Sequence, residues 1–304
     1  MEFFRNIDTY MAYGGNFYKL HVSSVAFNQT FRQKGAKQKT LHSPSSLIES
    51  SEINEANPAN FEIELLMVDG ESSSSRYQHK LLEVLLTNTN DTLNTFDLYI
   101  DPSTASDSPR KMYKLSLCVL ETGSFNISRN AVLSVSLQGS ASKLERVNHS
   151  TFSIGNFTSA ANTVYSIPKI VTVTVDGTIL DQVTGVNLEI QNDISWTKNN
   201  TLQQSLVATN AANTTYPTSF SLKGRDVAGN ITTYIGSSAS DVQTWKENIV
   251  IRIQAGLAAN NYQLDANLTP CSFTNRVNPT EVFTQGYDFR MIGSPTNLNT
   301  LFTY

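Results

Sequence analysis

Short stretches in which apolar and polar residues alternate recur along most of the chain, and they constrain the fold more than any other feature. In FEIEL, Phe61, Ile63 and Leu65 share one side of an extended chain, and Glu62 and Glu64 share the other. The same alternation occurs in LSLCV (115–119), VLSVSL (132–137), VTVTV (171–175), VNLEI (186–190) and IVIRI (249–253). Because successive side chains of a strand point to opposite faces, these stretches predict half-buried strands with one polar face. The chain is therefore predicted to be mainly β.

Two segments depart from this period and predict helices. The stretch SSSSRYQHKLLEVLLTN places Leu81, Leu82 and Leu85 on one stripe, behind serines that can cap a helix N-terminus. In the shorter stretch SASDVQTWKEN, Ser240 is followed three residues later by Gln243, which is the spacing of a capping box. We expect one flanking helix in each half of the chain.

The chain repeats the order of its elements. The stretch GSFNISRN begins at Gly123 and CSFTNRVN begins at Cys271, and each opens a closing hairpin after a polar stretch, a strand, a helix and another strand. A chain of 304 residues is long enough for two domains. We interpret residues 1–150 and 169–304 as two β-rich domains, with a polar linker over residues 151–168. In the second domain, VTVTV and VNLEI are expected to pair as a hairpin around DGTILDQVTG.

Composition excludes some classes of protein. Only 16% of the residues are charged and the formal net charge is -4, which argues against a protein that binds nucleic acid by neutralising phosphates. No apolar run approaches the roughly 20 residues needed to cross a bilayer, and no secretory signal is visible, so we expect no membrane contact and synthesis in a cytoplasm. Cys118 and Cys271 have no metal-binding companions and are predicted to be buried free thiols.

No constellation of residues indicates catalysis. The four histidines are scattered and none has metal-ligand spacing: His21, His42, His79 and His149. His79 and Glu83 have the spacing of a surface pair on a helix. Asp97, Asp101 and Asp107 lack the regular spacing of a calcium loop and suit a turn better. We therefore predict no enzyme activity, no cofactor and no metal site.

The polar segment from Asn28 to Asn60 is the main candidate for a functional site. Its first half is basic and its second half is acidic, with Arg32, Lys34, Lys37 and Lys39 followed by Glu49, Glu52 and Glu55. A solvated loop is one interpretation. Structureless stretches of this length are uncommon inside a compact domain unless they have a function, so a contact with another molecule is the other.

Sheet edges suggest how the domains are completed. A sheet with one helix leaves unpaired edge strands, which favour pairing with another chain. Three chains of two domains each could therefore join their sheets into one ring-shaped β-barrel without edges.

In three segments the chain resembles the tail tube proteins of long-tailed bacteriophages. These are the strand and polar loop that begin with YKLHVSSVAF, the segment IVTVTVDGTILDQVTGVNLEI and the helix YQHKLLEVLL. The resemblance is to the type with two fused tube domains, and it implies two tandem tube-like sandwich or barrel units in homotrimeric rings with pseudo-sixfold symmetry. It also implies that the polar loop reaches the neighbouring ring, and that double-stranded viral DNA passes through the channel during ejection without specific binding.

The same resemblance implies a place in the virion tail, assembly in the host cytoplasm, and tail terminator and tail-tip proteins as partners. One alternative is a distal-tail or baseplate ring protein with the same fold, which copy number in the virion would separate from a tube subunit. A second alternative is a carbohydrate-binding or adhesive β-sandwich, in which Trp196 and Tyr216 would form a sugar platform.

Overall fold

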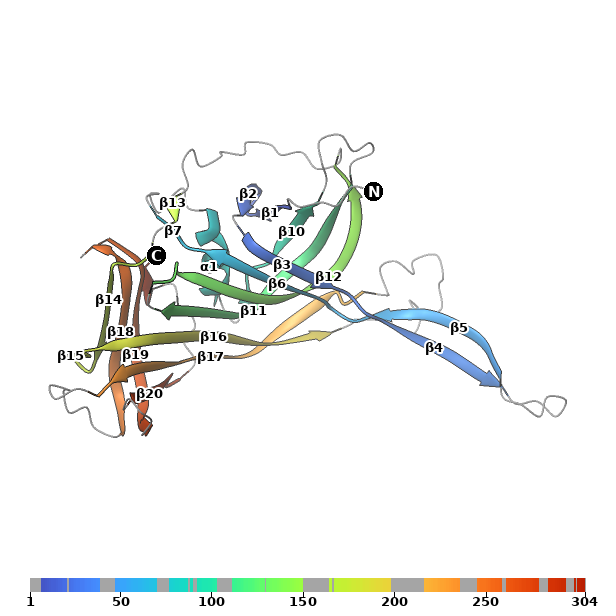
Figure 1. Ribbon diagram of the computed structural model, residues 1–304. Helices are drawn as coiled ribbons and strands as arrows, with labels where there is room; N and C mark the ends of the chain where they lie inside the picture. Colours follow the sequence, from blue (N-terminus) through green and yellow to red (C-terminus); the bar gives the residue numbers. More distant parts are fainter. Residues whose placement is uncertain are drawn as a thin grey trace.

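The computed structural model describes residues 7–20, 22–38, 47–69, 77–86, 88–89, 92–102, 111–128, 130–149, 164–165, 167–197, 216–235, 245–258, 261–278, 284–293, 298 and 300–303. Nearly all of this part of the chain is β-strand, with one α-helix, as the alternation predicts (Figure 1). The elements as far as residue 148 are β1 Asp8–Tyr13, β2 Asn16–Leu20, β3 Val22–Asn28, β4 Phe31–Gln38, β5 Leu47–Ala56, β6 Ala59–Leu66, β7 Val68–Asp69, α1 Tyr77–Leu86, β8 Asn88–Thr89, β9 Thr92–Leu93, β10 Phe96–Asp101, β11 Lys111–Ser128 and β12 Ser134–Asn148. The later elements are β13 Val164–Tyr165, β14 Ile170–Val175, β15 Thr178–Ile179, β16 Val183–Thr197, β17 Ser219–Tyr234, β18 Trp245–Ala258, β19 Asn261–Asn278, β20 Thr284–Met291 and β21 Phe302–Thr303.

The main antiparallel sheet contains the same strand order twice. One run is β2-β1-β10-β11-β12-β6-β3, and the other is β15-β14-β18-β19-β20-β17-β16. We call these runs the first unit and the second unit. In Figure 1 the sheet turns steeply, so that β18, β19 and β20 stand upright at the left while β16 and β17 run across the view. The repeated order supports our proposal that residues 1–150 and 169–304 form two domains.

The repeated sequence phrase corresponds to the same hairpin in each unit. Phe125 in β11 pairs with Val135 in β12, and Phe273 in β19 pairs with Phe289 in β20. Both phenylalanines are buried. The phrase therefore recurs because each unit needs an inward aromatic residue in its closing hairpin.

The two units meet through one antiparallel ladder, which we call the joint. β16 of the second unit pairs with β11 of the first, from Gln191 opposite Thr122 to Gly185 opposite Ser128. The ladder contains no register shift. Because strand pairing continues across the joint, both units belong to one sheet.

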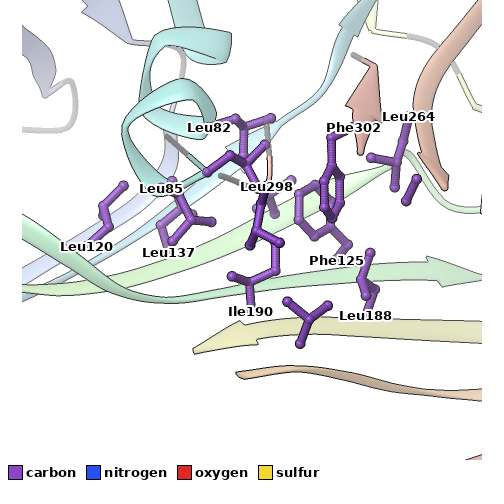
Figure 2. Packing of buried hydrophobic residues seen from close by; sticks show 14 of the residues in the cluster. Leu82, Leu85, Leu120, Phe125, Leu137, Leu188, Ile190, Leu264, Leu298 and Phe302 are labelled. Carbon is purple, nitrogen blue, oxygen red and sulfur yellow. The ribbon is translucent and has the colours of Figure 1, made fainter. Parts of the chain in front are cut away.

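Helix α1 covers the apolar side of the joint, as its sequence stripe predicts. Leu81, Leu82 and Leu85 are completely buried. In Figure 2, residues of the helix, of β11, β12 and β16 and of the C-terminal segment meet in one cluster. A Cβ atom on Gly123 would lie 2.3 Å from Leu85 Cδ2, so glycine is what permits this close packing.

Several sequence predictions about local structure are wrong. Asp97 and Asp101, which were expected in a turn, lie in strand β10. The strands VTVTV and VNLEI are not a hairpin, because β14 pairs with β18 and β15 whereas β16 pairs with β17 and β11. The stretch YKLHVSSVAF is split between β2 and β3 rather than forming one strand. Residues Trp245 to Asn248, which were predicted to be helical, begin β18, because pairing with β19 outweighs the local helix signal. The rest of that predicted helix lies outside the described residues.

The polar segment from Asn28 to Asn60 is a β-hairpin rather than a loop. Its strands β4 and β5 form a separate two-stranded sheet, which we call the arm, and Figure 1 shows it projecting from the body of the molecule. The predicted linker over residues 151–168 lies almost wholly outside the described residues. At its end, Val164 and Tyr165 form β13, which pairs with β7.

Candidate functional site

The candidate site is one face of eight consecutive strands in the order β19-β20-β17-β16-β11-β12-β6-β3, which we call the central row. One line of paired residues crosses the whole row: Ser272, Arg290, Ala228, Glu189, Ser124, Ser136, Glu64 and Ser24. A neighbouring line is apolar and points to the core: Val227, Ile190, Gly123, Leu137, Ile63 and Val25. The alternation seen in separate stretches of sequence thus becomes one continuous polar surface, which we call the polar face.

The polar face is acidic and otherwise rich in hydroxyl and amide groups. Its carboxylates include Glu62, Glu64, Glu189, Asp193, Asp226 and Asp288, and its described arginines are Arg276 and Arg290. Arg276 forms an ion pair with Asp288, and Arg290 Nε lies 2.8 Å from Asp226 Oδ1. Both arginines of this surface are therefore paired with carboxylates, which leaves the net charge of the face negative.

Hydrogen bonds between side chains hold polar groups in place on this face. Ser124 Oγ donates to Asn187 Oδ1 across the joint at 3.2 Å. Asn230 Nδ2 donates to Asp288 Oδ1 at 2.5 Å, and Ser23 Oγ donates to Glu64 Oε2 at 2.8 Å. Groups that already bond one another offer fewer open donors to a passing ligand. The surface is thus suited to weak and unspecific contact.

A buried polar cluster fixes the joint beneath this face. Asn192 Nδ2 donates to the carbonyl of Leu120 at 2.9 Å, and Arg225 Nε donates to Asn192 Oδ1 at 2.7 Å. The other guanidinium nitrogens of Arg225 donate to the carbonyls of Leu85 and Leu86 at 3.2 Å. These carbonyls end helix α1, where backbone acceptors lack helical partners and a cation is favourable. Burial lowers the pKa of Arg225 to about 10, so the side chain remains charged at neutral pH.

The structure brings the predicted arm residues onto two adjacent strands. Arg32 pairs in register with Glu55, and Lys34 pairs with Glu52, so a basic strand lies beside an acidic one. Lys37 belongs to β4 and Glu49 to β5. Lys39 lies outside the described residues.

The base of the arm is tied to the body of the molecule. Gln29 Nε2 donates to the carbonyls of Asn57 and Ser142 at 2.9 and 3.2 Å. The Leu144 amide donates to Gln29 Oε1 at 2.9 Å. Asn57 Nδ2 donates to Thr30 Oγ1 at 2.8 Å. These bonds set the direction in which the arm leaves β3 and β6.

The residues considered as reactive thiols or metal ligands do not form a site of their own among the described residues. Cys118 and Cys271 are buried and free, as predicted, and burial raises the pKa of the Cys271 thiol to about 12. His149 Nε2 lies 3.5 Å from Asp101 Oδ2. Within the described part of the chain, no group of three His, Cys, Asp or Glu residues could hold a metal ion. No helix in that part is long and apolar enough to span a membrane.

The proposed sugar platform is not an open aromatic surface. Trp196 is partly buried against Phe220, with ring centroids 5.4 Å apart, and its Nε1 donates to Ser140 Oγ at 2.7 Å. Tyr216 is also partly buried, between Phe31 and Lys143. Both rings have structural partners.

Sequence reasoning identified the arm but not the polar face as a site. Its signal was present in Glu62 and Glu64, the outward residues of FEIEL. Alternation shows that such residues share a face of one strand, but only long-range pairing shows that the faces of eight strands join.

Comparison with known proteins identifies the family of the chain. Residues 3–303 match the Bacteriophage Baseplate Tube Protein Family, a family of structural phage proteins. The chain belongs to this family. A chain in the cryo-EM structure of the anti-feeding prophage (AFP) baseplate, 6-fold symmetrised, is 11% identical with a TM-score of 0.36, and the match covers 47% of this chain and 93% of that chain. No curated protein sequence matches the chain.

Proposed function

We propose that this protein is a ring-forming subunit of the phage baseplate tube. Three copies, each with two units, would close a homotrimeric ring with pseudo-sixfold symmetry, and the polar face would line a channel for viral DNA. The observation on which this rests is the line of outward residues that crosses the eight strands of the central row and is polar on all of them except β17, which contributes Ala228. The family match supports a ring in the baseplate rather than the repeating tube of a long tail.

The chemistry of the polar face suits a channel through which DNA moves. Phosphate contacts by Lys and Arg add up to strong binding, which would stop a duplex from sliding. On this face, Arg276 and Arg290 are both neutralised by carboxylates, while Glu62 and Glu189 add negative charge. The mechanism is thus geometric and electrostatic, with DNA held only weakly.

Electron microscopy and sedimentation of the purified full chain test the ring. We expect closed rings with threefold symmetry, because a ring covers the sheet edges that a single chain leaves open. A compact monomer at high concentration in both measurements would refute the proposal. Copy number per virion then separates the two forms of the function, since a tail tube needs many rings and a baseplate needs one or two.

We further propose that the arm joins one ring to the next component of the tail, whether another copy of the ring, a terminator or a tail-tip protein. The arm projects from the body, and its strands have opposite charges. Replacing Arg32, Lys34, Lys37 and Lys39 with Glu should leave the body folded and abolish stacking. High salt should weaken stacking of the parent by screening.

Charge complementation separates contacts between rings from pairing within the arm. A second variant would replace Glu49, Glu52 and Glu55 with Lys. Each variant alone has an arm of a single charge sign and should not stack. A mixture of the two should stack again only if opposite charges meet between rings. Normal stacking by either variant alone, or no recovery on mixing, would mean that the arm is a solvated hairpin without a role in stacking.

A further inference from the structure

At the joint, the outer strand of the second unit, β16, pairs with β11 of the first unit. β10 pairs with β11 only as far as Phe96 opposite Cys118. The following stretch of β11, from Thr122 to Ser128, pairs with β16. Because β12 occupies the opposite edge of β11 along both stretches, β10 and β16 share one edge in succession. The departure of β10 is what leaves room for β16.

The second unit differs at the corresponding place. Here β18 does not leave β19, and its first residues continue the pairing, with Trp245 opposite Thr274 and Lys246 opposite Phe273. This stretch is irregular, since the register shifts on both sides of Ile249 and Asn248 has a φ of 58°. We call Trp245–Asn248 the cover, because it occupies the edge of β19 that matches the joint edge of β11.

Side chains around the cover are poorly buried. Trp245 is 65% exposed, and Val277, an inward residue near the end of β19, is 55% exposed. Asn275 Oδ1 is buried without a hydrogen-bond donor among the described residues. Lys246 is held by an exposed ion pair with Asp176, which contributes little to stability. The cover is therefore a weak and incomplete neighbour for β19.

The outer strand of the first unit, β3, has an unpaired edge instead of a poorly fitting neighbour among the described residues. Among the described residues, β3 pairs only with β6. Its apolar residues Val22, Val25 and Phe27 pack against the core but remain partly exposed. In β16, which holds the same position in the second unit, Val186, Leu188 and Ile190 are buried by the joint. Within the described part of the chain, β3 thus has an apolar edge without the neighbour that β16 has.

The directions of the strands would allow β3 of one copy to pair with β19 of another. The central row contains eight strands and every neighbouring pair is antiparallel. Its first strand, β19, and its last strand, β3, therefore run in opposite directions. When a second copy continues the row, its β19 meets β3 in the antiparallel sense, as β11 meets β16 in the joint.

We infer that the cover is a removable cap on β19, and that β3 of a second copy of this chain replaces it when copies assemble. This inference rests on the proposed ring function and adds which strands form the contact between chains. The cap protects one edge of the free chain from unspecific pairing. Assembly then requires the cover to leave β19, as β10 leaves β11 in the first unit.

A reversible crosslink on the full chain tests the inference. Trp245→Cys with Thr274→Cys places two thiols directly opposite each other, within the span of a disulfide. The native thiols Cys118 and Cys271 are buried, so they should not compete. A matched control, Ser124→Cys with Glu189→Cys, crosslinks the joint itself. Electron microscopy and sedimentation would compare both variants before and after reduction.

The oxidised cover variant should lower the fraction of protein in rings by about tenfold or more, and reduction should restore it. The joint control should assemble in both states. Rings formed equally well by the oxidised cover variant would overturn the inference and leave the ring function intact. A parent chain without rings would overturn both.

The β3 side of the contact has its own test. Val25→Lys puts a charge on the inward side of the free edge, while Ala26→Lys puts one on the polar face of the same strand. The first variant should remain folded by circular dichroism and stay monomeric by sedimentation, without forming rings. The second variant should still assemble into rings. Equal assembly by the two variants would exclude β3 from the contact.

Discussion

The outer strands of the two units, β16 and β3, have the same place in the strand order but different surroundings. β16 lies against β11, and its inward residues Val186, Leu188 and Ile190 are buried. β3 has no such neighbour in the described chain, and its inward Val25 is partly exposed. The residue types are alike. The comparison teaches that alternation in a strand marks which residues point inward, but the next strand decides whether they are covered.

The largest expected effect comes from breaking the core on which the joint rests. Leu81→Asp would bury an unpaired charge under the first unit and should cost about 4 kcal/mol or more, enough to abolish folding. Denaturant unfolding of the purified chain measures this. Lys80→Ala, in the partly exposed ion pair with Glu83, is the control and should change stability by about 1 kcal/mol or less. A stable, soluble Leu81→Asp protein would mean that the buried face of α1 is misplaced.

The next prediction compares the two strands directly. Leu188→Ala in the joint should destabilise the single chain by about 2 to 5 kcal/mol, because it opens a cavity among buried residues. Val25→Ala at the free edge should cost about 1 kcal/mol or less, since Val25 is already partly exposed. Urea unfolding under conditions that keep the chain monomeric provides both values. Equal losses would mean that β3 is covered in the single chain.

A smaller effect is expected from the polar cluster of the joint. Arg225→Met keeps much of the side-chain volume but leaves Asn192 Oδ1 and the Leu85 carbonyl without the Arg225 donor, while the Leu86 carbonyl keeps the Leu298 amide, so we expect a loss of about 1 to 3 kcal/mol. Arg252→Met removes an exposed pair with Asp265 and should cost about 1 kcal/mol at most. Thermal unfolding of the two variants is the measurement. Identical melting curves would show that the cluster does not stabilise the joint.

The smallest effect concerns the reactivity of one thiol. With a pKa raised to about 12, Cys271 is ionised in only about 1 molecule in 10,000 at pH 8, so iodoacetamide should label it very slowly. Cys271 pairs with Ile249 just beyond the cover, whereas Cys118 lies in the continuous sheet of the first unit. Mass spectrometry should therefore find that Cys271 is labelled before Cys118 in mild urea. The reverse order would mean that the cover is held more firmly than the first unit.

Much of the fold could be predicted from the sequence because half-buried strands show their period. The strands that contain FEIEL and IVIRI lie where alternation places them, and α1 lies where its leucine stripe places it. LSLCV is also in a strand, but Leu117 has a φ of 56° and interrupts the alternation, so that Cys118 is buried. Strand partners could not be predicted in the same way. Only the short β15 separates β14 from β16 in sequence, and the two look like a hairpin, yet they do not pair with each other, because alternation reports a face and not a neighbour.

The candidate site was predictable only in part, for the same physical reason. The sequence shows the charges of the arm as a basic half and an acidic half, but β4 and β5 have no apolar period, so it does not predict the hairpin. The polar face required the register of eight strands, which brings Ser24 and Ser272 onto one line from opposite ends of the sequence. Arg225 is one of two cations in β17, and only its contacts with the end of α1 reveal its role.

The joint between β11 and β16 also changes the kinetics of assembly, because both strands belong to one polypeptide. Groups linked within one chain meet at an effective concentration of about the millimolar range. Free proteins rarely reach that concentration in dilute solution. In the proposed ring, every second contact between units would therefore form without a bimolecular encounter. Three molecules rather than six would have to meet to make a nucleus, so rings should appear at a lower threshold concentration than from separated units. Fusion of the two units thus raises the effective concentration at which they meet, in addition to fixing their arrangement.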